Sequence, residues 1–128
     1  MRPDINSEKT TEDYLEAMLI IKNKNGEVRS VDVARQLGIT KPSVTYTTKR
    51  LREKGYITMD KDNYITITES GLKIAEKTYA RHKTLTQLFV RLGVPEDIAA
   101  EDACKIEHDI SPETFDALCR HLESYTKK

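Results

Sequence analysis

The fold of this chain is decided by residues 30–51, which read SVDVARQLGITKPSVTYTTKRL. Ser30 is a residue type that caps helices, and apolar residues follow it at helical spacing. These apolar residues are Val31, Ala34 and Leu37. Residues 38–40 form a short turn that begins with glycine, and Thr40 with Pro42 then opens a second helix. Two helices joined by such a turn are typical of a helix-turn-helix.

Alternating apolar and polar residues follow this motif in two short runs, residues 56–59 and 64–68. The turn-forming residues 60–63 separate the runs, which predicts a β-hairpin. On the other side of the motif, Thr10 or Thr11 caps a helix that ends at Asn25-Gly26. The order helix, helix, helix, hairpin and helix predicts a winged helix-turn-helix.

Three further helices are predicted in the rest of the chain. The first runs from residue 69 to a closing glycine at position 93, and the second runs from Pro95 to about Asp109. The third starts at Ser111-Pro112 and continues through Leu122. The predicted fold class is therefore mainly α, with the winged helix-turn-helix followed by a second helical domain.

Length and composition restrict the class of protein. The chain has 128 residues, of which 38% are hydrophobic and 33% are charged, and this excludes a collagen or a long disordered tail. The apolar runs are too short to span a bilayer, and the N-terminus has no apolar signal core. We therefore expect a cytoplasmic protein. The two cysteines are expected to be thiols rather than a disulfide.

The net charge of zero conceals a strong segregation of charge along the chain. Residues 22–93 carry 15 basic and 7 acidic side chains, a net charge of +8. Residues 1–21 carry 2 basic and 5 acidic side chains, and residues 94–128 carry 4 basic and 9 acidic ones. A basic centre between acidic ends favours a polyanionic partner for the middle of the chain.

Candidate DNA-binding residues lie in the second helix of the motif, since that helix enters the major groove in such folds. The segment from Lys41 to Lys54 contains five basic side chains and one acidic side chain. This excess of positive charge favours salt-dependent contact with phosphates. Lys61 at the hairpin tip is a further candidate for backbone contact. The complete set of candidates is Thr40, Lys41, Pro42, Ser43, Thr45, Tyr46, Lys49, Arg50 and Lys61.

Candidate metal ligands occur in two helices. Cys104, Glu107 and His108 have the spacing i, i+3 and i+4, which places them on one face of the predicted fifth helix. A thiolate, a carboxylate and an imidazole together can chelate a divalent transition metal. Asp13 and Glu16, at i and i+3, project together from the first helix. The sequence shows no recognised catalytic motif, so we do not expect an enzyme.

Five short motifs in the same order resemble the diphtheria toxin repressor family, metal-dependent transcriptional repressors that include the manganese transport regulators. The resemblance extends from about Thr11 to Thr126. The motifs are residues 11–16 (TEDYLE), 41–45 (KPSVT), 67–71 (ITESG), 81–82 (RH) and 104–111 (CKIEHDIS).

This resemblance implies a DNA-binding domain at residues 1–73 and a dimerisation and metal-binding domain at residues 74–128. It further implies a homodimer that binds a palindromic operator in double-stranded DNA and represses genes for metal uptake. The implied metal ligands are Asp13, Glu16, His82, Cys104, Glu107 and His108. The implied metal is Fe(II) or Mn(II), because Cys104 matches the iron-responsive branch and Asp13 and Glu16 match the manganese branch.

We hypothesise that one ion contacts both domains and thereby fixes the spacing of the two recognition helices. The dimer surface is predicted to include Ile98, Phe115, Leu118 and Leu122. Two alternatives remain open. One is a winged-helix regulator that responds to a small organic ligand or to thiol oxidation, and the other is a small metalloenzyme or metal-buffering protein that never binds DNA.

Overall fold

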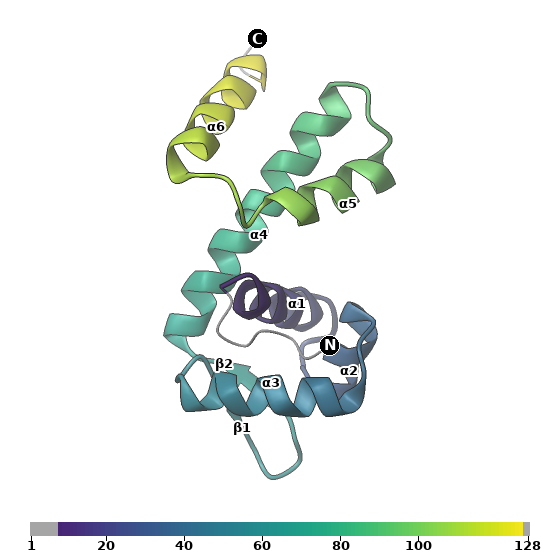
Figure 1. Cartoon of the computed structure of the whole chain (residues 1–128), viewed down its shortest axis with the longest axis vertical. Coiled ribbons are helices and arrows are strands. Elements are labelled where there is room, and N and C mark those ends of the chain that lie inside the picture. Colours follow the sequence, from purple (N-terminus) through teal and green to yellow (C-terminus); the bar gives the residue numbers. More distant parts are fainter. Residues whose placement is uncertain (1–7, 127–128) are drawn as a thin grey trace. The chain divides into compact units, whose positions relative to one another are not determined.

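The computed structural model (Figure 1) describes the backbone of residues 8–126 and the side chains of residues 9–124. The elements are α1 (Glu8–Asn25), α2 (Ser30–Leu37), α3 (Lys41–Glu53), β1 (Ile57–Met59), β2 (Ile65–Ile67), α4 (Glu69–Arg91), α5 (Glu96–Ile106) and α6 (Pro112–Thr126). The mainly helical fold class is confirmed. The chain forms two compact units, one ending at Lys77 and the other beginning at Thr78. The division between them falls within α4. The boundary predicted from the sequence, between residues 73 and 74, also lies within this helix.

The core of the first unit is built on α1. Its apolar residues Tyr14, Leu15, Met18, Leu19 and Ile21 are all buried. Helix α1 packs against α2, and α2 packs against α3. Burial raises the pKa of Tyr14, and the hydroxyl of Thr47 on α3 lowers it part of the way. The prediction that Thr10 or Thr11 caps this helix is wrong, because the helix already includes Glu8 and the buried Thr11 lies inside it.

The helix-turn-helix follows the predicted pattern closely. The N-cap of α2 is Arg29 rather than Ser30, and the Arg29 backbone N–H donates to Asp32 Oδ2 at 3.0 Å. Gly38 ends α2 with φ at 66°, a left-handed conformation that glycine adopts without a steric penalty. Thr40 caps α3, where its side chain accepts the N–H of Ser43 at 3.3 Å.

The predicted hairpin is also confirmed. Strands β1 and β2 are antiparallel, with Ile57 opposite Ile67. Asp60 shapes the connecting turn, because its Oδ1 accepts the N–H groups of Asp62 at 2.8 Å and Tyr64 at 3.0 Å. The Ile65 N–H donates to the Val28 carbonyl at 2.8 Å, which joins the hairpin to the segment before α2.

The second unit contains the rest of α4 together with α5 and α6. Leu85, Ala99, Ala103 and Leu122 are buried in it. Helix α5 is shorter than predicted, since it ends at Ile106 and Glu107 is its C-cap. His108 therefore lies in the following turn and not on the helix. None of the helices within residues 8–126 is both long and apolar enough to cross a membrane.

Candidate nucleic-acid interface and metal centre

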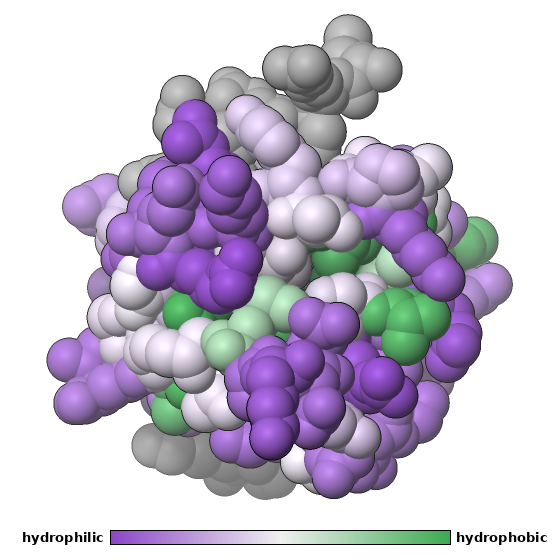
Figure 2. Space-filling model, turned by 90° about the horizontal axis from the view of Figure 1, so that it is seen from below, coloured by the Kyte–Doolittle hydropathy of each residue, from purple (hydrophilic) through white to green (hydrophobic). Residues whose placement is uncertain are grey.

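The nine predicted DNA-binding residues lie on α3, at its cap or in the hairpin turn. Eight of them are exposed, and Ser43 is partly buried. The opposite face of α3 carries Val44, Thr47, Thr48 and Leu51 into the core. The face seen in Figure 2, on the side of the hairpin and α3, carries hydrophilic side chains around a central area of paler and hydrophobic ones. This division between faces lets α3 present its polar side chains to a partner while its apolar side stabilises the fold.

Several hydroxyl groups on α3 are committed to the helix itself. Thr40 Oγ1 donates to Ser43 Oγ at 3.0 Å, and Thr45 Oγ1 donates to the Lys41 carbonyl at 3.0 Å. These bonds satisfy backbone and side-chain groups in the first turns of the helix. The exposed donors that remain available for an anion on this face include the ammonium groups of Lys41 and Lys49.

Tyr46 and Arg50 form a pair further along the exposed face of α3. The Arg50 guanidinium lies 5.9 Å from the centroid of the Tyr46 ring, and its Nη1 is 3.5 Å from Glu53 Oε1. Tyr46 remains 38% exposed. The pair places an aromatic ring and a planar cation side by side, an arrangement suited to contact with DNA.

Arg29 also belongs to this surface, although it is not among the residues predicted from the sequence. Its guanidinium lies 5.1 Å from the centroid of the Tyr64 ring. Together with Lys41, Thr45 and Asn63, it lines a cavity of about 190 Å³ between the hairpin turn and the start of α3. The backbones of Arg29 and Tyr64 pair in an isolated antiparallel β-bridge. Because the two residues lie far apart in the sequence, no local sequence pattern predicts this pairing.

A cluster of candidate metal ligands centres on Glu107 in the second unit. His82 Nδ1 on α4 donates to Glu107 Oε2 at 3.0 Å. His108 Nε2 lies 3.4 Å from Glu107 Oε1, and Cys104 has its Sγ within 4.8 Å of a Glu107 carboxylate oxygen. The structure therefore brings together all four predicted ligands of this unit, even though His108 lies beyond the end of α5.

The carboxylate of Glu107 is buried, with only 1% of the residue exposed. Its Oε1 accepts no hydrogen bond, although His108 lies nearby. A buried carboxylate oxygen without a hydrogen bond is costly, and a bound cation offsets that cost. The donor set of imidazole, thiol and carboxylate also suits a divalent transition metal. The residues present therefore fit a metal site.

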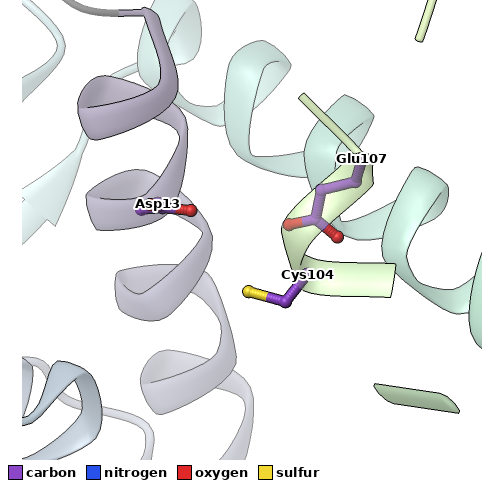
Figure 3. A group of neighbouring side chains, drawn as sticks. All are labelled: Asp13, Cys104 and Glu107. Carbon is purple, nitrogen blue, oxygen red and sulfur yellow. The ribbon is translucent and has the colours of Figure 1, made fainter. Parts of the chain in front are cut away.

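The other two predicted ligands lie on α1 in the first unit. Asp13 is partly buried and Glu16 is buried, and the two residues share one face of the helix. Figure 3 shows the side chain of Asp13 on α1 and those of Cys104 and Glu107 at the end of α5. Carboxylates are ligands for the harder divalent ions, in contrast to the sulfur of Cys104.

Arg81 has a role that was not predicted from the sequence, although it belongs to the Arg81-His82 motif. Arg81 is buried, and its Nη1 donates to the carbonyls of Glu107 at 3.0 Å and Ile110 at 3.2 Å. It thus contacts the backbone of the residue at the centre of the ligand cluster. A basic residue beside a candidate histidine is the only local signal that points to it.

The apolar surface of the second unit differs from the predicted dimer face. Ile98 is 45% exposed, but Leu122 is buried and Phe115 packs beneath the Arg81 guanidinium. Among the large apolar side chains of this unit within the described residues, Leu92 is the most exposed, at 72%. The exposed face therefore includes the end of α4 and the start of α5.

Comparison with known families matches nearly the whole chain. Residues 8–64 match the N-terminal DNA-binding domain of iron-dependent repressors, and residues 68–128 match their metal-binding and dimerisation domain. An uncharacterized HTH-type transcriptional regulator of Methanocaldococcus jannaschii is 36% identical over 122 residues, which are 94% of this chain and 98% of that protein. The transcriptional regulator MntR of Salmonella typhimurium is 37% identical over 114 residues, which are 89% of this chain and 73% of that protein.

Solved structures show the same fold. The crystal structure of IdeR from T. acidophilum superposes with a TM-score of 0.80 at 24% identity, over 88% of this chain and 53% of that one. The chain thus spans about half the length of that solved structure.

Proposed function

Because the chain belongs to the iron-dependent repressor family, we propose that it is a DNA-binding transcriptional repressor that responds to Fe(II) or Mn(II). The proposal assigns the chain to regulation rather than to catalysis. We further propose that the protein represses genes for metal uptake and that it is located in the cytoplasm. The observation that carries the proposal is the buried Glu107 carboxylate, which lies between two histidines and has an oxygen that accepts no hydrogen bond.

The proposed metal ligands in the second unit are His82, Cys104, Glu107 and His108. When bound, a divalent cation accepts electron pairs from such donors and neutralises the carboxylate charge. His82 and His108 already lie against the two oxygens of Glu107, so the folded chain holds these donors close together in advance. Little ordering is then required on binding, which favours affinity.

Asp13 and Glu16 are the proposed ligands from the first unit. Their carboxylates and that of Glu107 carry like charges, which repel one another when no cation is present. Sharing a cation with the second-unit donors would remove this repulsion and restrict the movement of α1 relative to α5. The proposed consequence is that the DNA-binding unit has a single orientation in the metal-loaded protein.

The proposed partner of the first unit is double-stranded DNA, with α3 in the major groove. Lys41, Lys49 and Arg50 would contact phosphates, and Tyr46 would reach the base edges. A homodimer presents two such helices, and a palindromic operator with half-sites about 34 Å apart matches that symmetry.

The test measures DNA affinity with and without metal. The duplex is selected from a random-sequence library by the wild-type protein in the presence of Mn²⁺, and Fe²⁺ is compared under anaerobic conditions. We expect the metal to tighten binding by a factor of about 5 to 150, corresponding to a coupling of roughly 1–3 kcal/mol. Glu107→Ala should lose this response.

The matched control is Glu101→Ala, which removes an exposed carboxylate from α5, the helix that Glu107 caps, and should retain the full response. A Glu107→Ala protein that still responds to metal would contradict the proposed site. A wild-type protein that binds DNA but responds to no divalent ion would favour a regulator of the organic-ligand or thiol-oxidation type. Failure to select any duplex would reject DNA binding.

A further inference from the structure

Adjacent residues on α4 hold Glu107 in two different ways. His82 contacts the side chain of Glu107, with Nδ1 at 3.0 Å from Oε2. Arg81 contacts its backbone, with Nη1 at 3.0 Å from the carbonyl oxygen. The same Nη1 donates to the carbonyl of Ile110 at 3.2 Å. One buried side chain therefore ties α4 to the end of α5 and to the connection that follows it.

The Arg81 guanidinium also packs on α6. Its central carbon lies 5.3 Å from the centroid of the Phe115 ring. A planar guanidinium can donate along its edge and stack through its face at the same time, whereas a lysine ammonium cannot. The carbonyl groups at the end of a helix carry partial negative charge, which stabilises a cation there. These contacts offset part of the cost of burying the Arg81 charge, although its buried Nε makes no hydrogen bond.

The position of these contacts matters because α5 ends just before two of the proposed ligands. Helix α5 stops at Ile106, with Glu107 as its C-cap and His108 in the turn beyond. The last carbonyls of a helix lack backbone donors from a following turn. Arg81 supplies a donor to the Glu107 carbonyl, in place of the N–H that a longer helix would provide. The segment that carries Glu107 and His108 is therefore fixed by a side chain from α4.

We infer that Arg81 is a positioning residue for the metal site, an inference that rests on the proposed function. It acts through the backbone of Glu107 and keeps the donors at the end of α5 in register with His82 on α4. Residues that orient metal ligands in this way typically contribute a factor of about 10 to 100 to metal affinity. Loss of the guanidinium should weaken metal binding by a factor in that range.

The test measures metal affinity directly in the full chain. Mn²⁺ is titrated in competition with a fluorescent chelator, and the visible absorption spectrum of the Co²⁺-loaded protein reports the geometry of the ligands. Arg81→Met keeps much of the volume but removes the donors, and we expect about 10- to 100-fold weaker Mn²⁺ binding and an altered Co²⁺ spectrum. Arg81→Lys retains one donor group and should recover part of the affinity and of the spectrum.

Lys83→Met is the matched control, because Lys83 is an exposed cation on the same helix and its ammonium lies over the Tyr79 ring. Its affinity should stay within about twofold of the wild-type value. If Arg81→Met binds Mn²⁺ as tightly as the wild type, with an unchanged Co²⁺ spectrum, the inference is wrong. If the wild type itself binds no metal, the proposed function fails first, and the inference with it.

A second variant covers the case in which Arg81→Met does not fold. Phe115→Leu removes the ring beneath the guanidinium but leaves Arg81 and every proposed ligand in place. We expect a severalfold loss of Mn²⁺ affinity with helical content retained. An unchanged affinity in this variant would overturn the inference.

Discussion

Thr40 shows how one side chain starts the recognition helix. It accepts the N–H of Ser43 and donates to the hydroxyl of the same residue. Its type and its position two residues before Pro42 were sufficient to predict the start of α3. Such caps are readable from the sequence because both partners lie within one turn of each other.

Replacing the cap should weaken the first unit. Thr40→Ala removes the acceptor for the Ser43 N–H and should lower the free energy of unfolding by about 1 kcal/mol. Thr40→Ser keeps an acceptor oxygen and should be near neutral. Urea unfolding followed by circular dichroism measures both, and equal stability of the two variants would show that the cap contributes nothing.

For the metal site, the positions of individual residues could be predicted only in part from the sequence. The spacing of Cys104, Glu107 and His108 was visible, but its interpretation as one helix face was wrong for His108, because α5 ends at Ile106. The donor that holds this end comes from Arg81, 26 residues before Glu107. Contacts across that separation leave no periodic signal. The ligand set itself came from resemblance, and it stays a prediction until metal binding is measured.

At the scale of elements, the sequence predicted the order of helices and the hairpin correctly. Glycine, proline and asparagine at the ends of the elements carried most of that information. The start of α1 was wrong because Thr10 and Thr11 are good capping residues, yet Thr11 is buried inside the helix. Tertiary burial decides such a case, and local propensity does not.

Gly71 belongs to a motif whose physical reason appears only in the structure. A Cβ at this position would lie 2.1 Å from the Tyr56 carbonyl oxygen and 3.0 Å from Ile67 Cγ2. Glycine therefore allows the first turn of α4 to approach the start of the hairpin. Helix propensity alone would favour alanine here by about 1 kcal/mol.

Gly71→Ala should accordingly destabilise the protein, by about 1–3 kcal/mol, because the backbone must shift to relieve the overlap. Lys73→Ala is the control, since Lys73 is exposed on the same helix. Thermal unfolding measures both variants. A Gly71→Ala protein as stable as the wild type, or more stable, would show that α4 moves away without cost.

Across the whole molecule, basic and acidic side chains are concentrated in different segments of the chain. The segment with net charge +8 includes α2, α3 and the hairpin, whereas the C-terminal segment is acidic. The second unit instead exposes apolar side chains, which favour contact with another protein surface. The family match to a dimerisation domain agrees with this distribution.

The exposed apolar side chains of the second unit should form the contact between two copies. We expect the wild type to sediment as a dimer at micromolar concentration, and Leu92→Glu combined with Ile98→Glu to sediment as a monomer. Val31→Glu alters an exposed apolar residue of the first unit and should leave the dimer intact. A monomeric wild type, or a dimeric double variant, would contradict this assignment.

We propose that the carboxylates of α1 make DNA affinity depend on metal that is bound mainly by the second unit. The most direct test is the ratio of operator affinities with and without Mn²⁺, measured for Asp13→Ala/Glu16→Ala beside wild type and Glu27→Ala. We expect the α1 variant still to bind Mn²⁺ through its remaining donors, but its ratio should fall close to one, while Glu27→Ala should keep the wild-type ratio. An undiminished ratio in the α1 variant would show that metal controls DNA binding by another route.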